Sequence, residues 1–301
     1  MDDAKSRNAV AVIGVGTIGS SIARHLVASD LTLTLYDARP EAAAPLVDAG
    51  GRLAASCADA ARDADWIIVA VVDDAQVTDV LTGPDGVLST ARPGSVIVLH
   101  STVRLDTVRD MASAAAAKGV GLIDAGVSTR GDDGTGKLAV FVGGETSEVE
   151  AARSLLHRYS HSIEHVGGLG SGMTAKLVRN LLGYSFMVAT YESLAFAESM
   201  GVDLDAFRRV LRDSDVTSQA QLVMDLPTTK PYTESEEAAA YWKNLTGLAG
   251  EELRDLLERA ESVMEKDMDE ITALAEETGF HMDFTGGTKP LLHHVLLLPD
   301  N

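Results

Sequence analysis

Short apolar runs alternate with amphipathic stretches through the first half of the chain. Apolar residues in the runs are continuous or alternate at a period of two, and between the runs they recur at helical spacing. The run at 65–72 is entirely apolar after its first residue, as in strands covered on both faces. The pattern predicts an α/β Rossmann-type doubly wound parallel sheet. Predicted strands lie within 9–16, 31–37, 65–72, 94–102, 119–128 and 138–144, and predicted helices within 17–29, 40–50 and 147–160.

Beyond residue 172 the strand pattern ends and long helical stretches follow. Residues 173–201 fit one helix of about eight turns at the usual 3.6 residues per turn. The segments 203–214 and 249–279 are helical as well. We therefore predict an α/β domain at 1–168 and an all-helical domain at 169–301, with the long helix as the join.

Composition excludes several classes of protein. The 301 residues carry a formal net charge of -20, which argues against a nucleic-acid surface because phosphate binding needs a basic footprint. The single cysteine, Cys57, excludes a disulfide framework and favours a cytoplasmic location. The apolar run near the N-terminus is broken by glycines and is too short for a signal peptide or a membrane span, so export and a membrane partner are not expected. The histidines show no spacing typical of a metal site, so none is expected.

A glycine pattern follows the first predicted strand and opens the first predicted helix. Gly14, Gly16 and Gly19 form G-x-G-x-x-G, with Thr17 and Ile18 between them. The pattern alone is weak, but this position between a strand and a helix is typical of a dinucleotide-binding turn. There the first glycine allows the turn, the second admits a pyrophosphate and the third lets helix and strand pack closely. The helix N-terminus supplies N–H donors for the phosphates.

The second predicted strand ends in an acidic residue. Asp37 lies 18 residues beyond Gly19, where a carboxylate would bind the hydroxyls of the adenosine ribose. A carboxylate there repels a 2′-phosphate, so the sequence favours NAD over NADP. Arg39 can soften that preference, which leaves NADP open.

Four stretches together resemble the β-hydroxyacid dehydrogenase family, which includes 3-hydroxyisobutyrate dehydrogenase and tartronate semialdehyde reductase. They are "GVGTIG" at 14–19, "DAGVS" at 124–128, "GSGMTAKLVRN" at 170–180 and "EKDMDEITALA" at 265–275. The third is the most specific, since it is similar without a gap to the family's glycine–glycine–lysine–asparagine motif. The resemblance spans nearly the whole chain and implies an active site in a cleft between the two domains.

Lys176 and Asn180 are four residues apart and share one helix face. A lysine beside a bound carbonyl can donate a proton as hydride arrives, or accept one from an alcohol as hydride leaves. The resemblance implies that Lys176 is this acid/base and Asn180 its partner. Taken without the other motifs, a solvated lysine and a helix-surface asparagine remain the alternative.

The loop after the fifth predicted strand departs from the family pattern. Ser128 matches the serine that binds the substrate carboxylate, and it is followed by Thr129 and Arg130, where relatives have two glycines. Gly126 stands where they usually have proline. One hypothesis is that Arg130 binds a second anionic group of the substrate through its guanidinium, and the alternative is a surface arginine.

The remaining candidates are cofactor contacts. Ser101 and Thr102 follow one strand, and Val72 and Asp73 end another, where the carboxyl ends of strands face a cofactor crevice. Capping of the next helix is the alternative for the two hydroxyls. Lys266 resembles the family lysine that closes over the cofactor, and a solvated helix face is its alternative.

We therefore expect an oxidoreductase that transfers hydride between a nicotinamide cofactor and a small β-hydroxy acid, or its semialdehyde or keto form. The family resemblance implies a homodimer or homotetramer assembled through the helical domain. An imine reductase has the same architecture, but its members commonly carry Asp or Tyr at the position of Lys176. A non-catalytic dinucleotide-binding module would usually lack the lysine.

Overall fold

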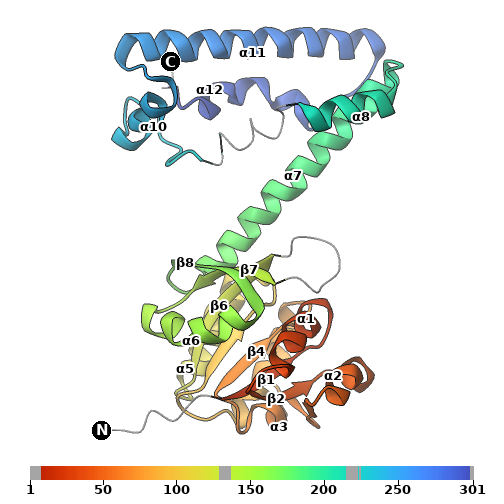
Figure 1. The fold of residues 1–301 in the computed structure, drawn as a ribbon, viewed down its shortest axis with the longest axis vertical. Helices are drawn as coiled ribbons and strands as arrows, with labels where there is room; N and C mark the ends of the chain where they lie inside the picture. The colour runs from red at the N-terminus through yellow and green to blue at the C-terminus, as the bar shows by residue number, and fades with distance from the viewer. Residues whose placement is uncertain (1–7, 129–136, 215–222, 224, 299–301) are drawn as a thin grey trace. The chain divides into compact units, whose positions relative to one another are not determined.

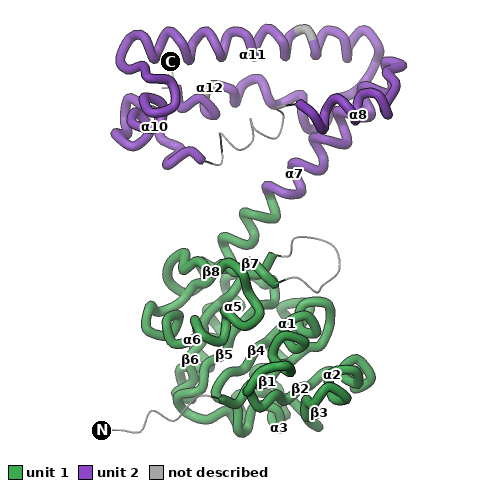
Figure 2. Tube along the Cα trace, viewed as in Figure 1, with its two compact units in different colours: residues 1–181 green, residues 182–301 purple. Residues whose placement is uncertain are grey.

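The protein divides into two compact units. In this computed structural model the described residues are 8–128, 137–214, 223 and 225–298. The units comprise residues 1–181 and 182–301 (Figure 2). Helix α7 (Ser171–Ser199) starts in the first unit and continues into the second. The sequence predicted a boundary at 168/169, which assigns the first turns of α7 to the helical domain, whereas the compact units assign them to the first unit. The predicted domain boundary itself stays a prediction.

An eight-stranded sheet organises the first unit (Figure 1). Its strand order is β3-β2-β1-β4-β5-β6-β7-β8, and every neighbouring pair is parallel except β6 with β7. The order reverses between β1 and β4, which is the switch point where ligands bind in doubly wound sheets. The predicted fold class is confirmed. The strands are β1 (Ala9–Ile13), β2 (Thr32–Tyr36), β3 (Arg52–Leu53), β4 (Trp66–Val69), β5 (Val96–Leu99), β6 (Gly121–Ser128), β7 (Leu138–Gly143) and β8 (Ser160–Gly167).

Helices cover both faces of this sheet, because the central strands are apolar on both. In β1, Val10 and Val12 join one buried cluster, while Ala11 and Ile13 join the other. The first cluster takes in α1 (Thr17–Val27), α2 (Ala44–Asp48) and α6 (Thr146–Tyr159). The second takes in α3 (Cys57–Ala61), α4 (Asp74–Thr82) and α5 (Leu105–Ala116). Burial of each large aliphatic side chain contributes about 1.5–3 kcal/mol.

Several local features differ from the predicted pattern, which also lacks the short strand β3 and the helices α3, α4 and α5. Strand β8 was not expected, because polar residues interrupt its apolar positions. It pairs only with β7 at the edge of the sheet, where one side of a strand has no strand neighbour. The predicted helix at 40–50 is divided into a 3-10 turn, Pro40–Ala43, and the short α2. Pro45 lies at the start of α2, since proline is accommodated in a first helical turn but not in a helix interior.

The second unit is helical. Its own core contains Trp242, Leu253, Leu257 and Leu297. The carboxylate of Glu192, on α7, accepts hydrogen bonds from the backbone N–H groups of Phe284 (3.0 Å) and Thr285 (2.6 Å). Besides α7, the described helices are α8 (Leu204–Asp213), α10 (Glu236–Thr246), α11 (Gly250–Thr278) and α12 (Leu292–Val295), with 3-10 turns at Thr285–Gly287 and Lys289–Leu291.

Candidate functional site

The glycine turn joins β1 to α1 in a conformation that requires glycine. Gly14 has φ +87°, and its N–H donates to the carbonyl of Tyr36 at 2.8 Å. A Cβ at Gly14 would lie 2.6 Å from the carbonyl oxygen of Ala70, and one at Gly19 would lie 1.8 Å from the carbonyl oxygen of Gly14. A Cβ at Gly16 would meet no atom within 4 Å. The backbone is therefore tightly packed at Gly14 and Gly19, whereas the space beside Gly16, at the start of α1, is open.

The N-terminus of α1 suits a pyrophosphate. Gly16 is its N-cap, no side chain caps the helix, and its first turn holds no acidic residue. Thr17 is exposed at the first helical position, whereas Ile18 packs partly against the core. Free N–H groups and an uncompensated helix dipole attract a phosphate. The residues present thus fit a dinucleotide, with Gly14, Gly16, Thr17 and Gly19 as the group that would hold its phosphates.

Asp37 is fixed beside this turn by backbone donors. Its Oδ2 accepts from the N–H of Val15 at 2.7 Å, and its Oδ1 accepts from the N–H of Arg39 at 2.9 Å. The Asp37 side chain is 11% exposed and that of Arg39 is 72% exposed, with Arg39 Nε 3.9 Å from Asp37 Oδ1. The carboxylate is therefore held in place at the end of β2, while the guanidinium stays largely in solvent.

The glycine turn and Asp37 share one pocket of about 700 Å³. Of the residues predicted from the sequence, Gly14, Gly16, Asp37, Arg39 and Val72 line it. The rest of the lining includes the segments 55–57 and 83–86. All of these residues belong to the first unit.

The other candidates at strand ends have local hydrogen bonds. Ser101 is buried, and its Oγ accepts from the N–H of Val71 at 2.9 Å. Thr102 is exposed. Asp73 caps α4, because its Oδ1 accepts from the N–H of Gln76 at 2.8 Å. Val72 is 78% exposed. Ser101 and Asp73 thus shape the turns around the pocket through their own backbone contacts.

The first turn of α7 is held by a carboxylate from the middle of the sheet. Asp124, on β6, is completely buried. Its Oδ1 accepts from the N–H of Gly170 at 2.7 Å, and its Oδ2 from the N–H of Met173 at 2.6 Å. Burial raises the pKa of Asp124, and these backbone donors oppose that rise. Asp124 therefore acts as an N-terminal cap for α7, although it lies 46 residues earlier in the chain than the first of its donors.

Lys176 packs against β6 at Gly126, which follows the capping residue Asp124 by two positions. A Cβ at Gly126 would lie 2.5 Å from the Cβ of Lys176 and 2.8 Å from the carbonyl oxygen of Gly172. Gly126 thus gives α7 room to approach the strand, which accounts for glycine at this position. Lys176 is partly buried. Burial, and then the nearby charge of Arg179, lower the pKa of its ammonium.

The remaining predicted residues fall in separate places. Ser128 ends β6 on the same strand face as Asp124 and Gly126, because alternate residues share a face. Asn180 lies one turn beyond Lys176 on α7 and is partly buried. Thr129 and Arg130 lie outside the described residues. Lys266 lies on α11 in the second unit, largely exposed, with its Nζ 3.2 Å from Asp267 Oδ1.

His100 and Tyr159 form a buried pair behind β6. His100 Nδ1 lies 2.6 Å from the carbonyl oxygen of Ala125, and Nε2 lies 3.0 Å from the hydroxyl of Tyr159. Nδ1 must therefore carry the proton that it donates to the carbonyl, and Nε2 accepts from the tyrosine. Burial lowers the pKa of His100 to about 4, so the imidazole is neutral.

Sequence reasoning did not assign roles to Asp124, His100 or Tyr159. The one available signal was a charged residue inside an apolar run, "GLIDAGVS", since a buried carboxylate needs hydrogen-bond partners. Its partners could not be found in the sequence, because they are backbone N–H groups at the start of another element.

The fold and the pocket place the first unit among Rossmann-type dinucleotide-binding domains. Residues 9–168 match the NAD binding domain of 6-phosphogluconate dehydrogenase. Residues 170–256 match a family described as NAD-binding of NADP-dependent 3-hydroxyisobutyrate dehydrogenase. Within the described residues, none of the helices combines the length and the apolar character needed to cross a membrane.

Curated relatives extend the match beyond the first unit. An uncharacterized oxidoreductase of Mycobacterium tuberculosis is 35% identical over 88% of this chain and 85% of its own length. The mitochondrial 3-hydroxyisobutyrate dehydrogenase of Rattus norvegicus is 30% identical over 75% of this chain and 70% of its own. The chain belongs to the β-hydroxyacid dehydrogenase family, and it is an NAD(P)-dependent oxidoreductase of that family. The predicted family and enzyme class are confirmed.

Solved structures share the fold. A crystal structure of a protein from Mycobacterium avium superimposes with a TM-score of 0.80 at 30% identity, covering 97% of this chain and 99% of that one. An imine reductase of Myxococcus stipitatus has a TM-score of 0.73 at 19% identity, covering 96% and 94%. The second likeness concerns the fold alone.

Proposed function

We propose that the enzyme oxidises a small β-hydroxy acid, or reduces the matching semialdehyde or keto acid, as a 3-hydroxyisobutyrate dehydrogenase-like enzyme. The observation that carries this proposal is the placement of Lys176. It is partly buried, has a lowered pKa and packs on Gly126 near the carboxyl end of β6. β6 is parallel to β5, and β5 to β4, so its carboxyl end lies at the same edge of the sheet as the glycine turn.

Lys176 would handle the proton in this reaction. A bound nicotinamide dinucleotide supplies the hydride acceptor in oxidation and the hydride donor in reduction. In the oxidation, the neutral amine of Lys176 would take the hydroxyl proton as hydride leaves the carbon that bears the hydroxyl. In the reduction, the protonated amine would give its proton to the carbonyl oxygen as that carbon receives hydride. Asn180, one turn away on the same face, can donate to and accept from the substrate hydroxyl or the lysine.

Ser128 would bind the carboxylate of the substrate. It lies two residues from Gly126 on the strand face against which Lys176 packs, so its hydroxyl belongs to the same surface as the acid/base. Thr129 and Arg130 follow it in sequence, and we propose that Arg130 meets a second anionic group. A diacid would then lose far more apparent affinity than a monoacid in Arg130→Ala.

The adenosine half of the cofactor would lie along the pocket that begins at the glycine turn. The turn would hold the pyrophosphate, Asp37 the ribose hydroxyls, and Val72, Asp73, Ser101 and Thr102 the nicotinamide side. Lys266 is proposed as a further cofactor contact from the family resemblance alone. The fixed carboxylate of Asp37 supports NAD over NADP, because it would face a 2′-phosphate. Asp37→Ser removes the negative charge but keeps a short acceptor for the Val15 N–H. We expect it to raise kcat/KM with NADP relative to kcat/KM with NAD.

We further propose a cytoplasmic homodimer or homotetramer with separate cofactor-binding (1–168) and helical (169–301) domains. The apolar surface of α7 supports self-association. Leu181, Tyr184, Met187 and Tyr191 are each more than 60% exposed, and large exposed apolar patches commonly mark interfaces.

A substrate panel tests the proposal. Small hydroxy acids and cyclic imines are assayed with NAD and with NADP on the native chain, Lys176→Ala and the matched control Lys118→Ala, an exposed lysine beyond the end of α5. We expect turnover of hydroxy acids only, with loss of rate in the first variant and retention in the second. Turnover confined to cyclic imines would make the enzyme an imine reductase, and cofactor binding without turnover would make it a binding module.

A further inference from the structure

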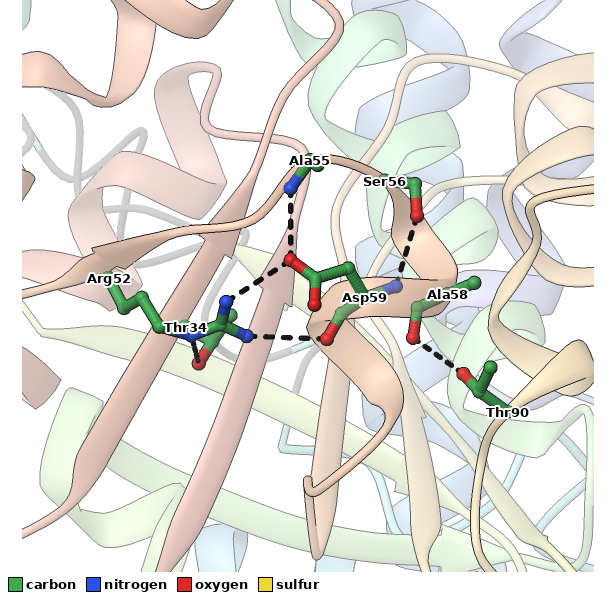
Figure 3. A network of polar contacts seen from close by, with 7 residues as sticks. All are labelled: Thr34, Arg52, Ala55, Ser56, Ala58, Asp59 and Thr90. Carbon is green, nitrogen blue, oxygen red and sulfur yellow. Dashed lines mark hydrogen bonds and ion pairs between the residues drawn. The ribbon is translucent and has the colours of Figure 1, made fainter.

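A hydrogen-bond network centred on Asp59 ties the end of β3 to the first turn of α3 (Figure 3). Asp59 Oδ2 accepts from the backbone N–H of Ala55 at 3.0 Å and from Arg52 Nη1 at 3.1 Å. Arg52 Nη2 donates to the backbone carbonyl of Asp59 at 3.3 Å. Ser56 Oγ accepts from the N–H of Asp59 at 3.0 Å, which caps α3. The connection from β3 to α3 is therefore fixed at both of its ends.

Contacts on either side fasten this network to the rest of the unit. Arg52 Nε donates to Thr34 Oγ1, on β2, at 3.4 Å. The N–H of Ala58 donates to the carbonyl of Asp85 at 2.8 Å, and Thr90 Oγ1 donates to the carbonyl of Ala58 at 2.5 Å. The first turn of α3 is thus held against β2 on one side and against the segment 85–90 on the other.

The parts held by the network are walls of the cofactor pocket. Ala55, Ser56 and Cys57 line the pocket together with Asp85. Arg52 and Asp59 lie behind this wall, where they line a smaller hollow with Thr34. If the pyrophosphate lies at the glycine turn and the ribose at Asp37, as in the proposed function on which this step rests, the adenine ring lies against the segments 55–57 and 83–86.

We propose that Arg52 and Asp59 are a positioning pair that holds the adenosine-binding wall in its binding conformation. Neither side chain touches the cofactor in this arrangement. Their side chains are 53% and 34% exposed, and such an ion pair alone contributes little to stability. Asp59 does more than pair with Arg52, because it also satisfies the N–H of a wall residue. The Ala55 N–H and then Arg52 lower the pKa of Asp59, as expected of contacts that favour its charged form.

The pair is therefore expected to affect the affinity for the adenosine half of the cofactor and not the rate of hydride transfer. A wall that is ordered before binding avoids the entropy cost of ordering it on binding. Loss of either partner is expected to raise the Kd for ADP about tenfold, which corresponds to about 1.4 kcal/mol. At saturating NAD, kcat and the KM for the hydroxy acid should not change.

The test measures ADP binding by calorimetry in the full-length protein, so it needs no turnover. The variants are Arg52→Met, which keeps an apolar stem, and Asp59→Ala, alone and combined. The control is Arg109→Met, which breaks a comparable exposed ion pair, with Asp106 at 3.2 Å on α5. We expect the control to bind ADP like the native protein. The double variant should bind no more weakly than the weaker single variant, since coupled residues are not additive.

Asp59→Asn keeps an oxygen for one donor and guards against misfolding of Asp59→Ala. It should lose about threefold in ADP affinity, between the native protein and Asp59→Ala. Native ADP affinity in folded Arg52→Met and Asp59→Asn would overturn the proposal, and so would an equal fall in kcat at saturating NAD. If the variants bind ADP as described but the native protein turns over no hydroxy acid, the positioning role of Arg52 and Asp59 is supported and the proposed function is wrong.

Discussion

Gly126 and Lys176 pack so closely that no side chain fits between their backbones. A Cβ added at Gly126 would lie 2.5 Å from the Cβ of Lys176. Gly126→Ala must therefore displace the first turns of α7. We expect it to lower the free energy of unfolding by about 1–3 kcal/mol, as overpacking does, and to lower kcat about 10–100-fold because the lysine moves.

Urea denaturation and steady-state kinetics measure both effects. Gly168→Ala is the matched control, because a Cβ there would meet no atom within 4 Å. Native kcat in Gly126→Ala would show that the position of Lys176 does not set the rate.

The pKa of Lys176 gives a second prediction, for the oxidation reaction. Burial and Arg179 lower this pKa from its ordinary value of 10.5. Only the neutral amine can accept the hydroxyl proton, so kcat/KM should rise with pH and level off below that ordinary value. Arg179→Ala removes the second cause, and its plateau should begin at higher pH.

The pH profile of Lys176→Arg tests whether the rising limb of kcat/KM comes from Lys176. A guanidinium stays protonated throughout the working range, so the rising limb should disappear and kcat should fall by about 10²-fold or more. An unchanged rising limb in this variant would assign the titration to another group.

Asp124 gives a third prediction, on the coupling of stability to activity. Asp124→Asn preserves the size of the side chain but turns an N–H donor toward backbone N–H groups of α7. We expect a loss of about 1–3 kcal/mol in the free energy of unfolding, the range for leaving a buried donor without its acceptor. The rate should fall as well, because the helix that carries Lys176 loses its cap. Asp106→Asn, an exposed carboxylate on α5, is the control for both urea denaturation and kcat.

His100 gives a fourth prediction, on acid stability. Its pKa is about 4 in the folded protein and 6.5 ordinarily, so the unfolded chain binds the proton first as pH falls. Its contribution is fully present above about pH 6.5 and is lost between there and about pH 4, to a total of about 3 kcal/mol. Urea denaturation of the native protein and His100→Gln across this range isolates the effect. Parallel stability curves for the two proteins would contradict it.

Much of the first unit could be predicted from the sequence, because its information is local. Continuous apolar runs mark strands covered on both faces, and glycine at Gly14 reflects a positive φ that few other residues adopt. The role of Asp37 toward a ribose follows only from its distance to Gly19, and it stays a prediction. The sequence did not show that Ser101 and Asp73 accept hydrogen bonds from neighbouring backbone, because a polar side chain at a strand end can contact backbone, a cofactor or both.

The contacts that hold the candidate lysine were beyond local reasoning. Asp124 reaches the N–H groups of residues 46 and 49 positions later, and His100 reaches a hydroxyl 59 positions later. Such pairings depend on how β6 meets α7 and α6 in space. Residue type alone indicated that Asp124 needed partners, but not which ones.

Three consecutive residues of β6 each contact a different partner. Asp124 caps α7, the carbonyl of Ala125 receives His100, and Gly126 makes room for Lys176. Because each position is constrained separately, a shift of the strand by a single residue would break all three at once. Attempts to redirect this enzyme to new substrates by directed evolution should therefore find no useful variation in that tripeptide, and should look to the loops around it.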